Sequence, residues 1–115
     1  MYARGEGVTQ DNAQAVSWYR KAAEQGLAIA QGNLGVMYAN GRGVVQDYGQ
    51  AVAWYRKAVA QNDLQALCAL AEHYERGLGV PQDKQQAIQL YQRAIAQTSG
   101  TDAQQLIQQR LNQLQ

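Results

Sequence analysis

The stretch Met-Tyr-Ala-Asn-Gly-Arg-Gly-Val at residues 37–44 recurs at a fixed distance along the chain and is the strongest indication of its architecture. It stands as Met-Tyr-Ala-Arg-Gly-Glu-Gly-Val at 1–8 and as His-Tyr-Glu-Arg-Gly-Leu-Gly-Val at 73–80, which places the copies 36 residues apart. A period of about 20 to 50 residues is typical of stacked arrays, in which each unit buries its apolar face against the next. The sequence therefore predicts a repeat array.

Composition and charge narrow the function classes. The 115 residues are 46% hydrophobic and carry a formal net charge of +1, with acidic and basic residues interleaved. There is no basic field for nucleic acid, no apolar run near the ~20 residues of a membrane span, and no signal-peptide layout. We expect a soluble chain that binds no nucleic acid and does not insert into a membrane.

The second unit, residues 27–62, serves as the template for one repeat. Its first helix, helix A, is predicted over residues 27–40, because small and apolar residues there share one side of a helix. These residues are Ala30, Leu34, Gly35 and Tyr38. Gly35 lacks a side chain, so we expect a neighbouring helix to approach the backbone closely at this point.

A glycine loop and a capped second helix, helix B, follow in each unit. Gly41 and Gly43 are predicted to form a loop with at least one positive φ, and Asp47 to cap helix B three residues before Gln50, as in a capping box. The equivalent structural residues of the third unit are Gly77, Gly79 and Asp83, and Asp11 takes this place in the first unit. The aromatic pairs of helix B, Trp18-Tyr19 and Trp54-Tyr55, are interpreted as core.

These residues carry a family resemblance. The pattern Leu34-Gly35-x-x-Tyr38-x-x-Gly41-x-Gly43-Val44-x-x-Asp47, followed by Ala51-x-x-Trp54-Tyr55-x-Lys57-Ala58, resembles the Sel1-like repeat, a relative of the tetratricopeptide repeat. The resemblance covers roughly residues 1–98. It implies an all-α, right-handed α-α superhelix, or solenoid, of 36-residue helix-turn-helix repeats with a C-terminal capping helix.

We expect residues 1–115 to form a single Sel1-like array. Its parts are a partial repeat at 1–26 that lacks most of helix A, repeats at 27–62 and 63–98, and a capping helix at 99–115. The incomplete start suggests a fragment or an upstream beginning, and makes self-association through this repeat possible. The capping helix is predicted to gather Leu106, Ile107, Leu111 and Leu114 on one face. Its register is open, because Ala103 is displaced by one residue from the position of Ala30 and Ala66.

Enzyme chemistry finds little support in the residues. We predict no catalytic residue, no metal ligands and no cofactor, because Cys68 and His73 are each the only residue of their kind. His73 occupies the position of Met1 and Met37 and is predicted to pack between helices. The repeated Gly-x-Gly lacks the further residues of a nucleotide-binding loop, so we interpret it as a turn.

The resemblance implies a protein–protein interaction scaffold that binds a peptide or protein in the concave groove lined by the A helices. The candidate contact residues face away from the core of helix A and are Asn33, Val36, Asn40, Ala69, Glu72 and Arg76. The alternative is a small-ligand binder or a weak β-lactam-hydrolysing, peptidoglycan-related protein, like the cysteine-rich Sel1-like relatives. The resemblance leaves both the bacterial envelope and the cytoplasm open as compartments.

Overall fold

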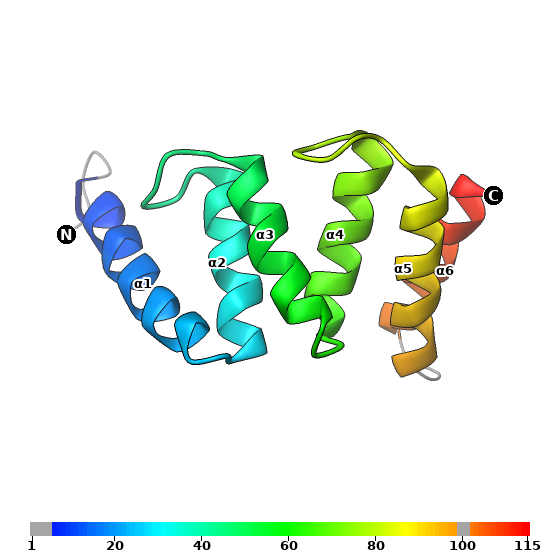
Figure 1. Ribbon diagram of the computed structural model, residues 1–115, viewed down its shortest axis with the longest axis horizontal. Helices are drawn as coiled ribbons and strands as arrows, with labels where there is room; N and C mark the ends of the chain where they lie inside the picture. The colour runs from blue at the N-terminus through cyan, green and yellow to red at the C-terminus, as the bar shows by residue number, and fades with distance from the viewer. Residues whose placement is uncertain (1–5, 99–101) are drawn as a thin grey trace.

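Helices in a row make up the described chain, residues 6–98 and 102–115 of a computed structural model (Figure 1). In chain order they are α1 (Glu6–Glu24), α2 (Ala28–Asn40), α3 (Tyr48–Val59), α4 (Leu64–Arg76), α5 (Lys84–Gln97) and α6 (Asp102–Leu114). Helices α1 to α5 follow one another along the long axis, and α6 lies behind α5 (Figure 1). The predicted all-α repeat solenoid is confirmed. Residues 1–5 and 99–101 lie outside the described residues. They contain the beginnings of the predicted partial repeat at 1–26 and of the predicted capping helix at 99–115.

The loop between helix A and helix B begins at a left-handed glycine and ends at an aspartate cap. Gly41 has a φ of 67°, and the carboxylate of Asp47 accepts a hydrogen bond from the Gln50 backbone N–H at 3.1 Å. The return bond of the predicted capping box is absent, because the Asp47 N–H donates to the Tyr38 carbonyl at 2.9 Å instead. The cap therefore also ties the loop back to helix A.

The second glycine of each loop joins neighbouring units. A β-carbon at Gly43 would stand 2.5 Å from the Asn12 carbonyl oxygen in α1, and one at Gly79 would stand 2.6 Å from the Tyr48 carbonyl in α3. Both glycines also have φ values above +70°. Only glycine combines this conformation with such a close backbone approach, so these positions set how tightly the units stack.

The first unit departs from the prediction. Helix α1 is continuous over Glu6–Glu24, so Gly7 and Asp11 lie within it and Asp11 caps nothing. In the second unit the loop depends on the Tyr38 carbonyl, whose counterpart Tyr2 lies outside the described residues. A continuous helix satisfies its backbone groups internally and needs no such acceptor. The prediction of a loop and a cap in this unit was wrong.

The aromatic pairs of helix B divide between core and surface. Tyr55 and Tyr91 are buried, and Trp54 is half-buried and packs against the core. Trp18 is 73% exposed, so the interpretation of this tryptophan as core was wrong. Adjacent residues in an α-helix point about 100° apart. Once the tyrosine faces helix A, the preceding tryptophan turns towards solvent. The ammonium group of Lys57 lies 4.5 Å from the centre of the Trp54 ring.

The register of α6 is shifted by one residue relative to the earlier A helices. Ile107 and Leu111 are buried, whereas Leu106 is 66% exposed, contrary to its predicted place on the apolar face. The buried residues Leu34 of α2 and Leu70 of α4 lie 36 residues apart. The equivalent buried residue of α6 is Ile107, which follows Leu70 after 37 residues. The side chain of Ala103, which indicated this shift, lies outside the described residues.

Candidate functional site

A groove runs between α4 and α6 on the side of the A helices. It has a volume of about 360 Å³. Its lining, which we call the α4–α6 groove, consists of Cys68, Ala69, Glu72, Tyr91, Leu106, Ile107 and Arg110. Helix α4 supplies small and acidic side chains, α6 supplies apolar and basic ones, and Tyr91 comes from α5. The lining of the groove thus combines an exposed leucine, a small residue and charges of both signs.

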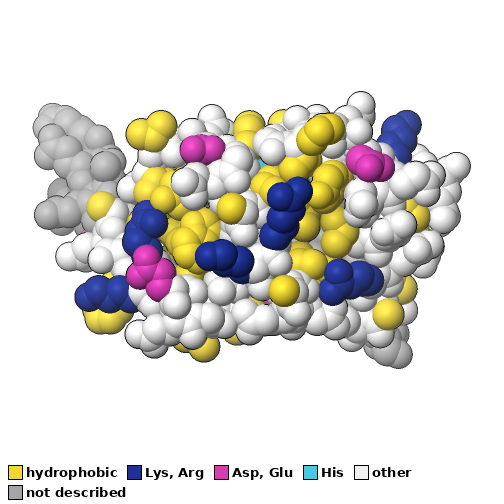
Figure 2. All heavy atoms as spheres, in the orientation of Figure 1, with side chains coloured by type: hydrophobic (Ala, Val, Ile, Leu, Met, Phe, Trp, Pro, Cys, Tyr) yellow, Lys and Arg dark blue, Asp and Glu magenta, His cyan; other side chains and the backbone are white. Residues whose placement is uncertain are grey.

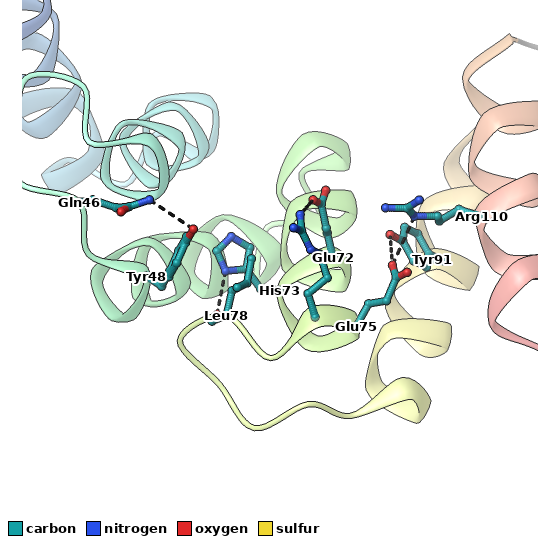
Figure 3. A network of polar contacts seen from close by, with 9 residues as sticks. Gln46, Tyr48, Glu72, His73, Glu75, Leu78, Tyr91 and Arg110 are labelled. Carbon is teal, nitrogen blue, oxygen red and sulfur yellow. Dashed lines mark hydrogen bonds and ion pairs between the residues drawn. The ribbon is translucent and has the colours of Figure 1, made fainter.

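Polar contacts hold the walls of the groove (Figure 3). Arg110 Nε lies 3.3 Å from Glu75 Oε1, and the Tyr91 hydroxyl donates to the same oxygen at 3.3 Å. On α4, Arg76 pairs with Glu72 at 2.9 Å one helical turn away. Through the Glu75 carboxylate these contacts join α6 to α4 and α5 to α4.

Tyr91 acts in this groove as a neutral hydrogen-bond donor. Burial raises its pKa to about 12, and the charge of Glu75 adds to this effect while Arg110 opposes it. Contact with Tyr91 and the charge of Glu75 raise the pKa of Arg110 further above its ordinary value. The groove therefore presents a neutral phenol and a charged guanidinium.

The single cysteine and histidine have packing environments. Cys68 is half-buried in the groove wall, and burial raises the pKa of its thiol, which disfavours the reactive thiolate. The β-lactam alternative gains nothing from this thiol. His73 is 5% exposed, with Nδ1 2.9 Å from the Leu78 carbonyl oxygen and its ring edge-on to Tyr48 and Tyr55. It fills the space between helices that its repeat position predicts.

The predicted contact residues occupy three places. Ala69 and Glu72 line the α4–α6 groove, and Arg76 stands beside it through its ion pair with Glu72. Val36 is half-buried against the core and Asn40 is exposed at the end of α2. Asn33 lines a separate groove near α1.

Five groove residues were not among the predicted contacts: Cys68, Tyr91, Leu106, Ile107 and Arg110. Tyr91 holds the repeat position of Tyr55 and is buried like it, but it also contributes to the lining of the groove. Leu106 and Arg110 depend on the register of α6. The displacement of Ala103 was the one signal that could have placed them.

A second groove lies between the C-terminal half of α1 and the N-terminal half of α2, with a volume of about 540 Å³. We call it the end groove, and its lining consists of Trp18, Tyr19, Ala22, Leu27, Ala28, Ile29, Ala30 and Asn33. Trp18 is 73%, Leu27 57% and Ile29 70% exposed. Large apolar side chains that are exposed together often mark an interaction surface, whereas singly exposed ones are ordinary.

Other kinds of site find no counterpart in the described residues. Within them, no three His, Cys, Asp or Glu side chains are grouped so as to hold a metal ion. None of the described helices combines the length and apolar character that crossing a membrane requires. On the face seen in Figure 2, lysine and arginine side chains are spread singly among hydrophobic patches rather than gathered in one basic field.

The succession of helix pairs defines a class, the all-α repeat solenoid. The Sel1 repeat model matches residues 1–27, 28–63 and 64–99. The chain belongs to the Sel1 repeat family. Proteins of this family generally act as protein-interaction scaffolds without enzymatic activity.

Two solved structures illustrate the likeness. A Sel1 repeat protein from Oxalobacter formigenes is 40% identical with a TM-score of 0.72, over 76% of this chain and 36% of that one. The protective antigen c5321, present in uropathogenic Escherichia coli strains and displaying an SLR fold, is 45% identical with a TM-score of 0.76, over 85% of this chain and 21% of that one. The chain thus spans between about a fifth and a third of the length of these proteins. No curated protein matches it significantly.

Proposed function

We propose that this chain is a non-enzymatic interaction module that binds a peptide segment of a partner protein along its inner face. The α4–α6 groove is the centre of this surface, and the remaining contacts extend it along α2 and α4. The proposed contact residues are Asn33, Val36, Asn40, Ala69, Glu72 and Arg76, joined by Leu106 and Arg110.

The exposure of Leu106 carries the proposal. Leu106 is 66% exposed and lines the same groove as the small Ala69, so the groove offers apolar surface to one side chain of a peptide. Burying the leucine against such a side chain contributes about 25 cal/mol per Å² of apolar surface removed from water. The groove volume of about 360 Å³ lies at the small end of the range for binding pockets and suits a side chain better than a large cofactor.

The charges at the groove support a partner with both acidic and basic groups. The side chains of Arg76 and Glu72 are 59% and 44% exposed, and a pair so exposed contributes little to stability. Exchanging it for a pairing with the partner therefore costs the fold little. Opposite charges on the rim of an interface favour the correct partner and its orientation.

Selection of peptides from a displayed random library tests the proposal. We expect the chain to select peptides with one large apolar residue, and Leu106→Arg to lower their affinity at least ten-fold. Val45→Arg is the matched control, because Val45 is 88% exposed in a loop away from the groove. Failure to select any peptide, or equal loss in both variants, would contradict the proposal.

A second variant tests the charged rim. Glu72→Gln together with Arg76→Gln should weaken capture of the selected peptides while leaving the helical circular dichroism signal and the melting temperature unchanged. Equal loss of binding and of thermal stability would show that these residues support the fold rather than the binding surface.

A further inference from the structure

The two ends of the α4–α6 groove differ in chemistry. One end, which we call the apolar end, is lined by Cys68, Ala69, Leu106 and Ile107. The other, which we call the polar end, consists of Glu72, Glu75, Arg76, Tyr91 and Arg110. Helices α4 and α6 run in the same direction (Figure 1), and the contact of Arg110 with Glu75 puts the polar residues of both helices at one level. A segment that lies along the groove therefore meets apolar surroundings at one end and charged ones at the other.

The polar end exposes more positive than negative charge. The exposed fractions of its charged side chains are 59% for Arg76, 44% for Glu72, 42% for Arg110 and only 20% for Glu75. The Glu75 carboxylate is already used, because the Tyr91 hydroxyl and Arg110 Nε both contact its Oε1 atom at 3.3 Å. A partner thus meets two guanidinium groups and one carboxylate, which favours an acidic group over a basic one.

Arg110 is better placed than Arg76 to bind that acidic group. Arg76 pairs with Glu72 on its own helix and lies outside the groove lining, whereas Arg110 is part of the lining. Glu75 holds Arg110 by its Nε, and the Tyr91 hydroxyl also contacts the guanidinium. A guanidinium is a planar fork with more N–H donors than two acceptors use. Figure 3 shows this fork reaching from α6 towards α4, so its remaining donors suit a carboxylate in the groove.

We propose that the peptide segment bound in this groove carries an acidic side chain two residues from its large apolar residue, and that Arg110 is the residue that selects it. This inference rests on the peptide-binding function proposed above. Leu106 and Arg110 are four residues apart in α6, which is about 6 Å along the helix axis. An extended chain advances about 3.3 Å per residue and turns residues two apart to the same side. A spacing of two residues therefore brings the apolar side chain to Leu106 and the carboxylate to Arg110.

A displayed library of nine-residue segments, with leucine fixed at the centre and the other positions random, tests this spacing. We expect the full chain to enrich aspartate or glutamate two residues before or after the leucine, and to deplete lysine and arginine there. The side on which the acid is enriched gives the direction in which the segment lies. Selection with Arg110→Gln should lose the acidic preference. Arg42→Gln is the matched control, because Arg42 is exposed in the loop after α2 and lies outside the groove lining.

Two synthetic peptides measure the strength of the contact. The most enriched segment is made with aspartate and with asparagine at the acidic position, and both forms are acetylated and amidated so that no terminal carboxylate competes. The asparagine form should bind the unchanged protein at least about ten-fold more weakly, because a hydrogen bond to a charged group is lost. Arg110→Gln should bind the two forms within about two-fold of each other. It should also bind the asparagine form as the unchanged protein does, which shows that the groove is intact.

The outcomes separate this proposal from the peptide-binding function on which it rests. Enriched segments that depend on Leu106 but carry no acidic preference at either position would overturn the role of Arg110 and leave peptide binding standing. Equal affinity of the two synthetic peptides for the unchanged protein would do the same. Enrichment of lysine or arginine at those positions would overturn the proposal in favour of Glu72. Failure to enrich any segment would contradict peptide binding itself, and the acidic preference with it.

Discussion

The Tyr55 ring lies directly against the backbone of Gly35. A β-carbon at this glycine would stand 2.6 Å from the ring Cε1 atom and 2.8 Å from Cδ1. Real β-carbons do not approach a neighbour so closely, so the α2–α3 hairpin takes this form only with glycine here. The third unit has alanine, Ala71, at the same repeat position, and both Ala71 and Tyr91 are buried.

Gly35→Ala should destabilise the protein by about 1–3 kcal/mol, the usual cost of overpacking a core. Gly32→Ala is the control in the same helix, because a β-carbon there meets its nearest neighbour at an ordinary 3.4 Å. That variant should gain about 0.5–1 kcal/mol from higher helix propensity. Urea unfolding measures both values, and equal effects of the two changes would contradict the close contact.

Asp47→Ala should cost about 1 kcal/mol, because it removes the acceptor for the Gln50 N–H at the start of α3. Asp11→Ala should change stability by less than about 0.5 kcal/mol, since Asp11 is exposed within α1. The two aspartates hold the same repeat position, so the difference in melting temperature tests whether the first unit lacks the cap. Equal losses would mean that α1 begins near Asp11.

Stability should fall in alkaline solution through Tyr55 and Tyr91. Burial is the main cause that raises the pKa of each from 10.0 to about 12. The unfolded chain loses these protons near pH 10 and the folded chain near pH 12, so the contribution is full below pH 10 and declines between the two. Each tyrosine lowers the free energy of unfolding by about 1.4 kcal/mol per pH unit in this window.

Urea unfolding at several values between pH 8 and 11 measures this decline. Tyr91→Phe removes one of the two ionising groups, so its stability should fall less steeply with pH than that of the wild type. Identical slopes for the two proteins would show that Tyr91 ionises equally easily when folded and unfolded.

The complete units were predictable because each position of the repeat occurs in more than one unit of the sequence. The left-handed Gly41 and the capping Asp47 follow from local rules on glycine and helix starts. The first unit was not predictable in this way. In the second unit the loop is held by the Tyr38 carbonyl, which accepts from the Asp47 N–H, and the equivalent Tyr2 lies outside the described residues. A local signal cannot form a turn whose bonds are made by another helix.

The grooves required information that the period does not contain. Periodicity places Ala69 and Glu72 on the inner face of α4, but it cannot tell which of the adjacent Trp18 and Tyr19 faces the core. The α4–α6 groove also depends on where α6 begins relative to α5. A shift of one residue rotates a helix by about 100° and exchanges Leu106 for Ile107 at the buried position.

This shift in α6 gives the last prediction. Leu34→Ala should cost about 2–5 kcal/mol, because Leu34 is fully buried in the core. A strict 36-residue period would assign a similar cost to Leu106→Ala, whereas the shifted register predicts a change within about 0.5 kcal/mol because that side chain is mostly in water. Ile107→Ala should instead show the large loss. Chemical unfolding of the three variants measures these costs. A large loss for Leu106→Ala together with a small one for Ile107→Ala would show that α6 keeps the 36-residue register and that Leu106 does not line the α4–α6 groove.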